Sequence, residues 1–186
     1  ILSSNLVSNG DFSQEGAEEV SNGSFSQEGA EEVTNGDFAT DTDWTKTQAI
    51  ISNGKATITS ADGSYAGVYQ NFLTIGKTYS YSIDVYSVTN GVSIFSGSSL
   101  SRLMTSPGNY KGTFVATNIR LEIKRNADDI MSAEIDNVSV KEVGQDWTLG
   151  TGWSIGEDKV VGDGTMGGNV FGQNVGFTQG NTYKFS

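Results

Sequence analysis

Runs of strictly alternating residues, interrupted by glycine-containing turns, constrain the fold of this chain most strongly. Between residues 79 and 86, apolar side chains occupy every odd position from Tyr79 to Val85, and the even positions are Ser, Asp or Tyr. The same period of two recurs over residues 110–115 and 119–124. Because successive side chains of a β-strand point to opposite faces, this period predicts strands with one buried face.

Asn-Gly pairs lie beside these runs and predict tight hairpin turns. One pair, residues 53–54, separates Ile51 from residues 56–58, so these two segments are expected to form a hairpin. A second pair, residues 90–91, directly follows the longest alternating run. The chain is therefore expected to fold largely through antiparallel neighbours.

The last alternating run, residues 133–140, breaks the period in its middle. The step from Ile135 to Val138 is three residues, where a regular strand would require two. An extra residue on one strand of a pair forms a β-bulge. We therefore expect a bulge near Asp136 and Asn137.

The composition supports an all-β fold that is large enough to form a core. The 186 residues include 24 Gly and one Pro, and 35% of the residues are hydrophobic. This hydrophobic fraction is sufficient for a two-sheet core and too high for a disordered chain. Roughly seven or eight short strands, with turns between them, predict an antiparallel β-sandwich.

A 13-residue unit is repeated at the start of the chain. It spans residues 7–19 and 20–32, with Ser24 where the first copy has Asp, and a third copy begins at Val33 and departs after Phe38. Each copy has the pattern V-x-N-G-x-F, and an acidic stretch follows the first two. Residues 1–32 are either a flexible acidic leader or a set of donated strands that dock on neighbouring modules or subunits.

A second module is expected to begin near residue 144. Residues 146–148 repeat residues 43–45, and residues 178–186 repeat the pattern of residues 74–82. The expected domains are therefore the repeats at 1–32, a sandwich at 33–143, and the first half of a similar module at 144–186. Half a sandwich cannot bury its core, so we expect a longer natural chain or a partner that completes the second module.

Charge and residue usage exclude several classes of function. The formal net charge is −11, and residues 1–32 carry seven acids without Lys or Arg, which disfavours nucleic acid as a partner. There is no Cys for a disulfide or a thiolate site, and no apolar run approaches a membrane span. Without His, the Ser-His-Asp and Cys-His systems are excluded, and we expect no enzyme activity.

Five short elements in one order resemble carbohydrate-binding modules of families 4 and 9. These elements are residues 33–38, 43–44, 68–70, 76–79 and 133–140. The resemblance covers residues 33–142 and, in truncated form, residues 144–186. It implies a jelly-roll β-sandwich that opens with an N-G-[DE]-F segment and closes with an I-D-[DN]-V strand.

The closing strand, the sequence that follows it, and the stuttered V-x-N-G-x-F copies also look like modules strung along bacteriophage virion proteins. This resemblance implies a structural or adhesive module of a head or tail fibre or a decoration protein. Its partners would be other virion subunits or copies of itself in a homo-oligomer, together with host-surface polysaccharide. Its location would be the virion surface.

Two alternatives remain open at this point. One alternative to the virion module is a carbohydrate-binding module of a secreted bacterial polysaccharide-degrading enzyme, which would place the chain outside the cell or on its surface. The chain is also compatible with a purely architectural module that has no ligand, because one scaffold serves many functions.

The resemblance further implies a structural Ca²⁺. In such modules an acid of the opening segment and the Asp of the closing strand approach the same cation, and the matching positions here are Asp37 and Asp136. Asn35 and Asn137 are possible additional oxygen donors. In the alternative interpretation, Asp37 caps a turn and Asp136 is a solvated acid at a strand end.

Aromatic side chains are the usual platforms for sugar rings. The candidate carbohydrate-binding residues are Tyr65, Tyr69, Tyr86 and Tyr110, and partial burial at a sandwich edge is the alternative for each. The strand period instead assigns Tyr79 and Tyr81 to the core, and the recurrence of Trp44 as Trp147 favours a framework role. The alternating charges Arg120, Glu122 and Lys124 are candidates for hydrogen bonds to a ligand or for a solvated strand face.

Overall fold

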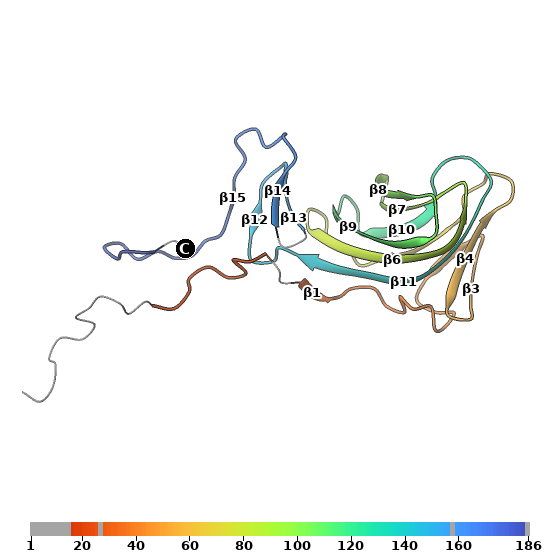
Figure 1. Cartoon of the computed structure of the whole chain (residues 1–186), viewed down its shortest axis with the longest axis horizontal. Helices are drawn as coiled ribbons and strands as arrows, with labels where there is room; N and C mark the ends of the chain where they lie inside the picture. The colour runs from red at the N-terminus through yellow and green to blue at the C-terminus, as the bar shows by residue number, and fades with distance from the viewer. Residues whose placement is uncertain (1–15, 26–27, 157–158, 185–186) are drawn as a thin grey trace, which may run out of the picture.

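The computed structural model of the chain describes residues 16–25, 28–156 and 159–184, and every regular element in this part is a β-strand (Figure 1). Two antiparallel sheets form the body of the molecule. The larger sheet has the order β3-β4-β11-β6-β9, and β1 pairs with the far half of β11. The smaller sheet has the order β2-β5-β10-β7-β8. No helix long and apolar enough to cross a membrane occurs in the described residues.

The larger sheet contains six strands: β1 (Glu28–Glu31), β3 (Ala49–Ser52), β4 (Lys55–Ser60), β6 (Thr78–Thr89), β9 (Gly108–Val115) and β11 (Met131–Val143). The smaller sheet contains five strands: β2 (Thr45–Thr47), β5 (Gly67–Asn71), β7 (Val92–Ser96), β8 (Ser99–Met104) and β10 (Arg120–Arg125). In Figure 1, β6 and β11 are long curved strands, and β7, β8 and β10 lie on the inner side of the curve.

The apolar faces of the two sheets meet in one core. The larger sheet contributes residues such as Ile58, Ile83 and Ile135, and the smaller sheet contributes Leu121 and Ile123, all with no exposed surface. The predicted β-sandwich character is therefore confirmed. Tyr79 and Tyr81 are buried in this core, as the strand period predicts.

The hairpin and bulge predictions are also confirmed. Strands β3 and β4 pair across the turn at residues 53–54. The pairing of β11 with β6 shifts register between Asp136 and Ser139, and Asn137 has a positive φ of 50°. The sequence pattern missed the edge strands β2 and β8, because β2 has three residues and no apolar side chain, and the apolar residues of β8 do not alternate.

The V-x-N-G-x-F motif at residues 33–38 shapes the loop that enters the sandwich. The Asn35 side chain exchanges hydrogen bonds with the backbone of Thr40 and donates to the carbonyl oxygen of Thr42 at 3.0 Å. The indole of Trp44 donates to the backbone oxygen of Asn35 at 2.9 Å, and its ring lies 5.2 Å from that of Phe38. Trp44 and Phe38 are buried, so the framework role predicted for Trp44 is confirmed.

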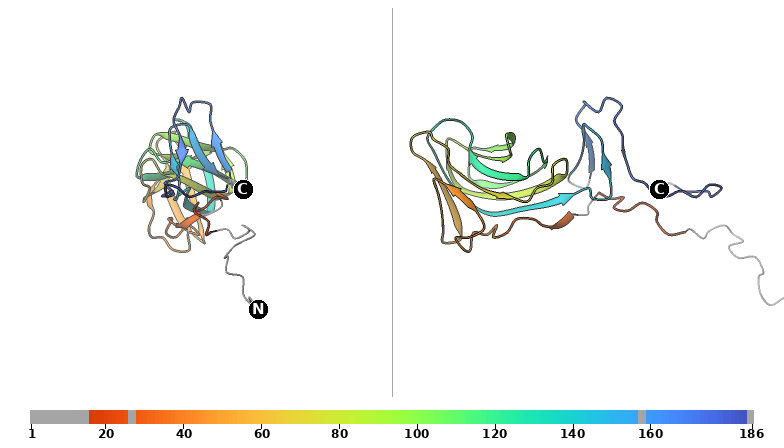
Figure 2. Two further views of the ribbon diagram at one scale, coloured as in Figure 1. Left: turned by 90° about the vertical axis from the view of Figure 1, so that its left-hand side faces the viewer. Right: turned by 180° about the vertical axis from the view of Figure 1, so that it is seen from behind.

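The described residues after Val143 include two small sheets beside the end of the sandwich (Figure 2). Strands β12 (Thr148–Leu149) and β15 (Phe171–Gly172) pair with each other, as do β13 (Trp153–Gly156) and β14 (Lys159–Gly162). The hydroxyl of Tyr183 accepts a hydrogen bond from the backbone N–H of Thr178 at 2.9 Å. Tyr79 and Thr74 form the same bond at 2.9 Å, so the two segments share a local structure as well as a sequence pattern.

Candidate functional site

The outer face of β10 carries a row of charged side chains. Because Leu121 and Ile123 point into the core, Arg120, Glu122 and Lys124 point to the opposite side of the strand. Strand β10 is the central strand of its sheet, between β5 and β7. The row therefore lies in the middle of a sheet face rather than at its edge.

Glu122 is buried although it lies on the outer face of the sandwich. Its residue surface is 6% exposed. Arg120 Nη1 lies 3.1 Å from one carboxylate oxygen, and Lys124 Nζ is paired with the other. A buried carboxylate is tolerated only when its charge is compensated, and the two cations supply that compensation.

Aromatic rings flank this charged row on both neighbouring strands. The guanidinium of Arg120 lies 3.9 Å from the ring centroid of Tyr69, which faces Glu122 across the β5–β10 pair. The ammonium of Lys124 lies 4.4 Å from the ring centroid of Phe95, which faces Glu122 across the β7–β10 pair. Cross-strand register therefore places an aromatic ring on each side of the buried carboxylate.

Tyr65 completes the group from the chain segment that leads into β5. Lys124 Nζ lies 5.8 Å from its ring centroid. Burial raises the pKa of the Tyr65 hydroxyl, and the negative charge of Glu122 adds to this effect. Gly67 lies between the two tyrosines, and a Cβ there would approach the Cβ of Lys124 to 2.6 Å, so only glycine permits this packing.

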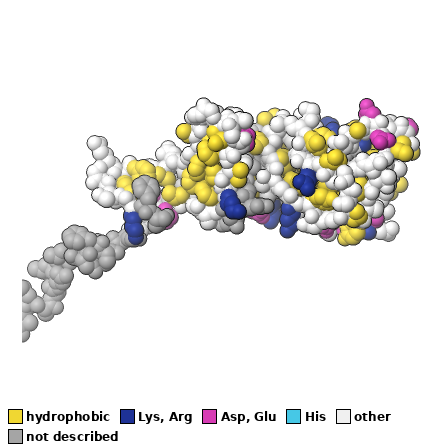
Figure 3. Space-filling view, turned by 45° about the horizontal axis from the view of Figure 1, so that its top comes forward, with side chains coloured by type: hydrophobic (Ala, Val, Ile, Leu, Met, Phe, Trp, Pro, Cys, Tyr) yellow, Lys and Arg dark blue, Asp and Glu magenta, His cyan; other side chains and the backbone are white. Residues whose placement is uncertain are grey.

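We call these six residues the Glu122 cluster: Tyr65, Tyr69, Phe95, Arg120, Glu122 and Lys124. The cluster combines ring faces, a carboxylate and two hydrogen-bond-donating cations on one face. Figure 3 turns the top of Figure 1 toward the viewer and shows hydrophobic side chains interspersed with mainly uncharged polar surface over the sandwich. Such a combination can pack against the C–H faces of a sugar and hydrogen-bond to its hydroxyls.

Tyr69 and Tyr65 are thus brought together, whereas Tyr86 and Tyr110 are not part of this group. Tyr86 lies on β6 of the other sheet, is 48% exposed, and has Lys55 Nζ 4.0 Å from its ring centroid. Tyr110 lies on β9, packs against the core, and donates its hydroxyl hydrogen to the backbone oxygen of Ser106 at 2.8 Å. The four candidates from the sequence therefore divide into one pair, Tyr65 and Tyr69, and two tyrosines in other surroundings.

Phe95 is a member of the Glu122 cluster that the local sequence pattern does not predict. It lies next to Ile94, whose side chain enters the core, so strand alternation sends Phe95 to the outer face. A large aromatic residue at an outward position of a strand was the available signal. Its significance depends on β7 being the neighbour of β10, which the local pattern does not specify.

The metal-site candidates Asp37 and Asp136 lie at the opening loop and at the bulge of β11. Burial raises the pKa of the Asp136 carboxyl, and the charges of Asp84 and Asp37 raise it further. Asp84 differs, since donors from Asn109 and Asn137, at 2.8 and 2.9 Å, lower its pKa. Asp136 therefore ionises against a local excess of negative charge.

The surroundings fit a calcium ion only in part. Asp37 and Asn137 line the same shallow depression between the opening loop and β11, and their oxygens are the hard donors that Ca²⁺ prefers. The side-chain oxygen of Asn35 already accepts a hydrogen bond from Thr40. Among the described residues, no group of three or more His, Cys, Asp or Glu is placed to hold a metal. A calcium ion here would need backbone oxygens or water as further ligands.

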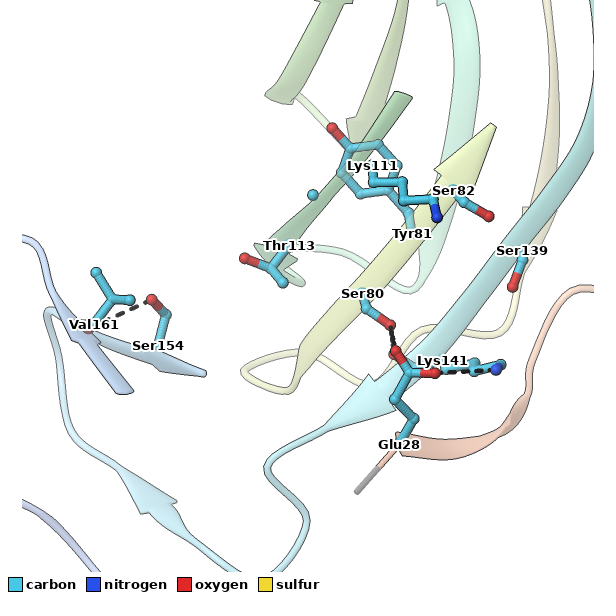
Figure 4. A pocket seen from close by; sticks show the side chains of 11 residues that line it. Glu28, Ser80, Tyr81, Ser82, Lys111, Thr113, Ser139, Lys141, Ser154 and Val161 are labelled. Atoms are coloured by element: carbon cyan, nitrogen blue, oxygen red, sulfur yellow. Dashed lines mark hydrogen bonds and ion pairs between the residues drawn. The ribbon is translucent and has the colours of Figure 1, made fainter. Parts of the chain in front are cut away.

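A separate groove of about 560 Å³ lies between the larger sheet and the β13–β14 hairpin (Figure 4). Glu28 forms an ion pair with Lys141 at 3.0 Å in its floor and accepts a hydrogen bond from Ser80. Its other polar lining residues include Ser82, Lys111, Thr113, Ser139 and Ser154. Tyr81 is the one aromatic residue in the described lining and is only 6% exposed, so the groove presents no ring for stacking.

No protein-family model matches this sequence, and a comparison with curated proteins gives no significant match.

Proposed function

We propose that this chain is a structural and adhesive module of a bacteriophage virion protein, and that it binds host-surface glycans. In this proposal residues 33–143 form a jelly roll of the carbohydrate-binding type. The crossing of the chain between two curved antiparallel sheets, with β10 between β5 and β7, is compatible with that topology. The tandem repeats and the second module support a protein that grows by adding units.

The Glu122 cluster is the observation that carries the glycan-binding proposal. Glu122 is a buried carboxylate on an outer sheet face, with Arg120 and Lys124 as its partners. Stability alone does not require this arrangement, because apolar residues at such positions are often equally stabilising. An arrangement that pairs fixed polar groups with two tyrosines is suited to a polar ligand with apolar ring faces.

The test is binding of the full chain, displayed at high valency, to a panel of bacterial and plant polysaccharides. Multivalent display converts weak single-site binding into measurable retention. Tyr69→Ala should weaken retention of the bound polysaccharide by about tenfold, which corresponds to the loss of one stacking contact. Glu122→Gln should weaken it as well, because the charge that orients Arg120 and Lys124 is removed.

Tyr86→Ala is the matched control. This variant also removes a tyrosine ring that lies close to a cation. The distance from the cation to the ring centroid is 4.0 Å for Lys55 and Tyr86 and 3.9 Å for Arg120 and Tyr69. Tyr86, however, belongs to the other sheet. Retention should be unchanged in this variant. Equal losses in the Tyr86 and Tyr69 variants would contradict a site at the Glu122 cluster.

A purely architectural module is the second candidate, and one observation favours it. Arg120 and Lys124 already lie against the rings of Tyr69 and Phe95, so a sugar must displace them or stack beside them. Absence of retention for every polysaccharide, with the chain shown to be folded, would support this function over glycan binding.

A further inference from the structure

The second copy of the V-x-N-G-x-F motif is not a free leader in this structure. Residues 20–25 lie beside β12 and β15 of the C-terminal part, although these strands are distant from them in the sequence (Figure 1). The indole of Trp147 donates a hydrogen bond to the backbone oxygen of Asn22 at 3.0 Å. The side-chain amide of Gln173 both accepts from the backbone N–H of Ser21 at 2.9 Å and donates to its carbonyl oxygen at 3.0 Å.

The same contacts hold the third copy on the main sandwich. The indole of Trp44 donates to the backbone oxygen of Asn35 at 2.9 Å. The side-chain amide of Gln70 accepts from the backbone N–H of Thr34 at 3.2 Å and donates to its carbonyl oxygen at 2.6 Å. In each module, therefore, one Trp and one Gln form hydrogen bonds with two successive backbone positions of one motif copy.

Backbone and ring geometry agree in the two copies. Asn22 and Phe25 have φ values of 48° and 58°, and the corresponding residues of the third copy, Asn35 and Phe38, have values of 53° and 48°. The backbone N–H of each Phe donates to the carbonyl oxygen of its Asn, at 3.0 Å in the second copy and 3.2 Å in the third. The ring of Phe25 lies 5.1 Å from that of Trp147 and 5.9 Å from that of Phe171, so it belongs to the aromatic cluster of the C-terminal part.

The two sets of contacts differ in their separation along the chain by a constant number of residues. Trp44 follows Asn35 by nine residues, whereas Trp147 follows Asn22 by 125 residues. Gln70 follows Thr34 by 36 residues, whereas Gln173 follows Ser21 by 152 residues. Both separations are longer by the same 116 residues in the second set.

We propose that residues 20–25 are the opening segment of the C-terminal module, and that the main sandwich is inserted between this segment and the rest of that module. The modules are then nested. The third motif copy, residues 33–38, opens the main sandwich, and the second copy, residues 20–25, opens the C-terminal module that follows the sandwich. The interaction surface is the site formed by Trp147, Phe171 and Gln173, and its occupant is a V-x-N-G-x-F segment of the same chain. This arrangement is independent of whether the main sandwich binds a glycan.

Cysteine cross-linking of the full chain tests the proposal, because the chain has no native Cys. Ser21→Cys combined with Gln173→Cys should form a cross-link within one chain under oxidation or with a short bismaleimide. The matched control is Thr34→Cys combined with Gln70→Cys, the corresponding pair of the main sandwich. The two pairs should cross-link with the same efficiency, and the products should migrate as monomers in denaturing electrophoresis.

Two results would overturn the proposal. Absence of a cross-link in the Ser21/Gln173 pair, with the control pair cross-linked, would show that residues 20–25 do not dock on the C-terminal module. Cross-linked dimers at protein concentrations where the control pair gives monomers would show that the segment docks on a second copy of the chain.

Fluorine NMR of 5-fluorotryptophan-labelled protein provides a second readout without introduced cysteines. Phe25→Ala should shift the Trp147 resonance and leave the Trp44 resonance in place. Phe177→Ala is the control, because it removes another phenylalanine ring from the C-terminal part, where the ring centroids of Phe177 and Tyr183 lie 4.6 Å apart. This variant should leave the Trp147 resonance unchanged. An unshifted Trp147 resonance in Phe25→Ala would contradict the docking.

Discussion

A Cβ atom at Gly36 would lie 2.0 Å from the backbone oxygen of Val138, well inside the space that this oxygen occupies. A hydrogen bond between the same two residues holds the opening loop on β11, because the backbone N–H of Val138 donates to the oxygen of Gly36 at 2.9 Å. In the V-x-N-G-x-F motif of residues 33–38, the glycine is therefore required for close packing, the asparagine forms the loop, and the phenylalanine belongs to the core.

Gly36→Ala should therefore lower the free energy of unfolding by about 3 kcal/mol, because the backbone of β11 cannot move away without breaking its pairing. Urea denaturation monitored by tryptophan fluorescence measures this change. Gly172→Ala is the control, since a Cβ there meets no atom within 4 Å, and it should change stability by no more than about 0.5 kcal/mol. Equal stabilities of the two variants would contradict the close approach at Gly36.

The pair of Asp37 and Asp136 makes a residue-scale prediction about calcium. If the cation neutralises this acidic site, saturating Ca²⁺ should raise the thermal midpoint of the wild type by roughly 5–10 °C relative to chelator. Asp136→Asn should abolish most of this increase, while its side-chain oxygen can still accept the hydrogen bond from the backbone N–H of Asn137. Differential scanning calorimetry with calcium and with chelator measures both values.

Asp129→Asn provides the control for general charge effects, because this acid is exposed in a loop away from the opening segment. Its calcium response should equal that of the wild type. A wild-type protein whose midpoint is the same in calcium and in chelator would exclude the site.

At the scale of elements, β1 shows how the acidic part of a repeat is used. Glu28 and Glu31 of this strand face Val143 and Lys141 of β11, so the strand extends the larger sheet. The Glu31 carboxylate also accepts hydrogen bonds from Ser139 Oγ at 2.5 Å and from the backbone N–H of Val140 at 2.8 Å. Acids that look like a solvated leader in the sequence therefore hold a strand in place.

The ion pair of Glu28 with Lys141 gives this strand a pH dependence. The hydrogen bond from Lys141 lowers the pKa of the Glu28 carboxyl below its ordinary value of 4.5. Because the folded-state pKa is lowered, the pair stabilises the fold above pH 4.5, and this contribution is lost as the pH falls through the lowered folded-state pKa. The pair is partly exposed, so its contribution should be below about 1 kcal/mol.

Glu28→Gln should make the acid limb of the stability profile shallower between pH 7 and pH 3, as measured by urea denaturation across that range. Lys141→Gln removes the same interaction from the other side and should give a similar profile. The double variant should then lose less stability than the sum of the two single losses, because both single variants remove the same interaction. An acid limb as steep as that of the wild type in both single variants would show that the pair does not contribute.

At the scale of the whole molecule, burial is distributed unevenly along the chain. The main core cluster lies entirely between Val33 and Val140, and Ile155 is the one buried hydrophobic side chain in the described part after residue 143. The C-terminal part is held mainly by half-buried rings, such as those of Trp147 and Phe171 at 4.8 Å. Local opening should therefore be easier there than in the sandwich.

Hydrogen exchange measured by mass spectrometry should show this difference directly. Backbone amides of β6, β10 and β11 should exchange slowest, and those of β12, β13, β14 and β15 should exchange at least about tenfold faster, because fewer buried contacts oppose local opening. Phe25→Ala should accelerate exchange in these four C-terminal strands without affecting β6. Uniform protection along the chain would contradict the unequal distribution of the core.

Local sequence patterns predict the long central strands, the hairpin at residues 53–54, the bulge beside Asp136, and the core positions of Tyr79 and Trp44, but not the edge strands β1, β2 and β8. These features depend on local periodicity and turn chemistry, which are written in neighbouring residues. The position of Tyr69 and Phe95 on either side of Glu122 arises only in the folded chain, because it depends on which strands become neighbours in a sheet. The same holds for the docking of residues 20–25 on Trp147, which lies 125 residues beyond Asn22, since a contact of that range is selected by packing and not by any local pattern.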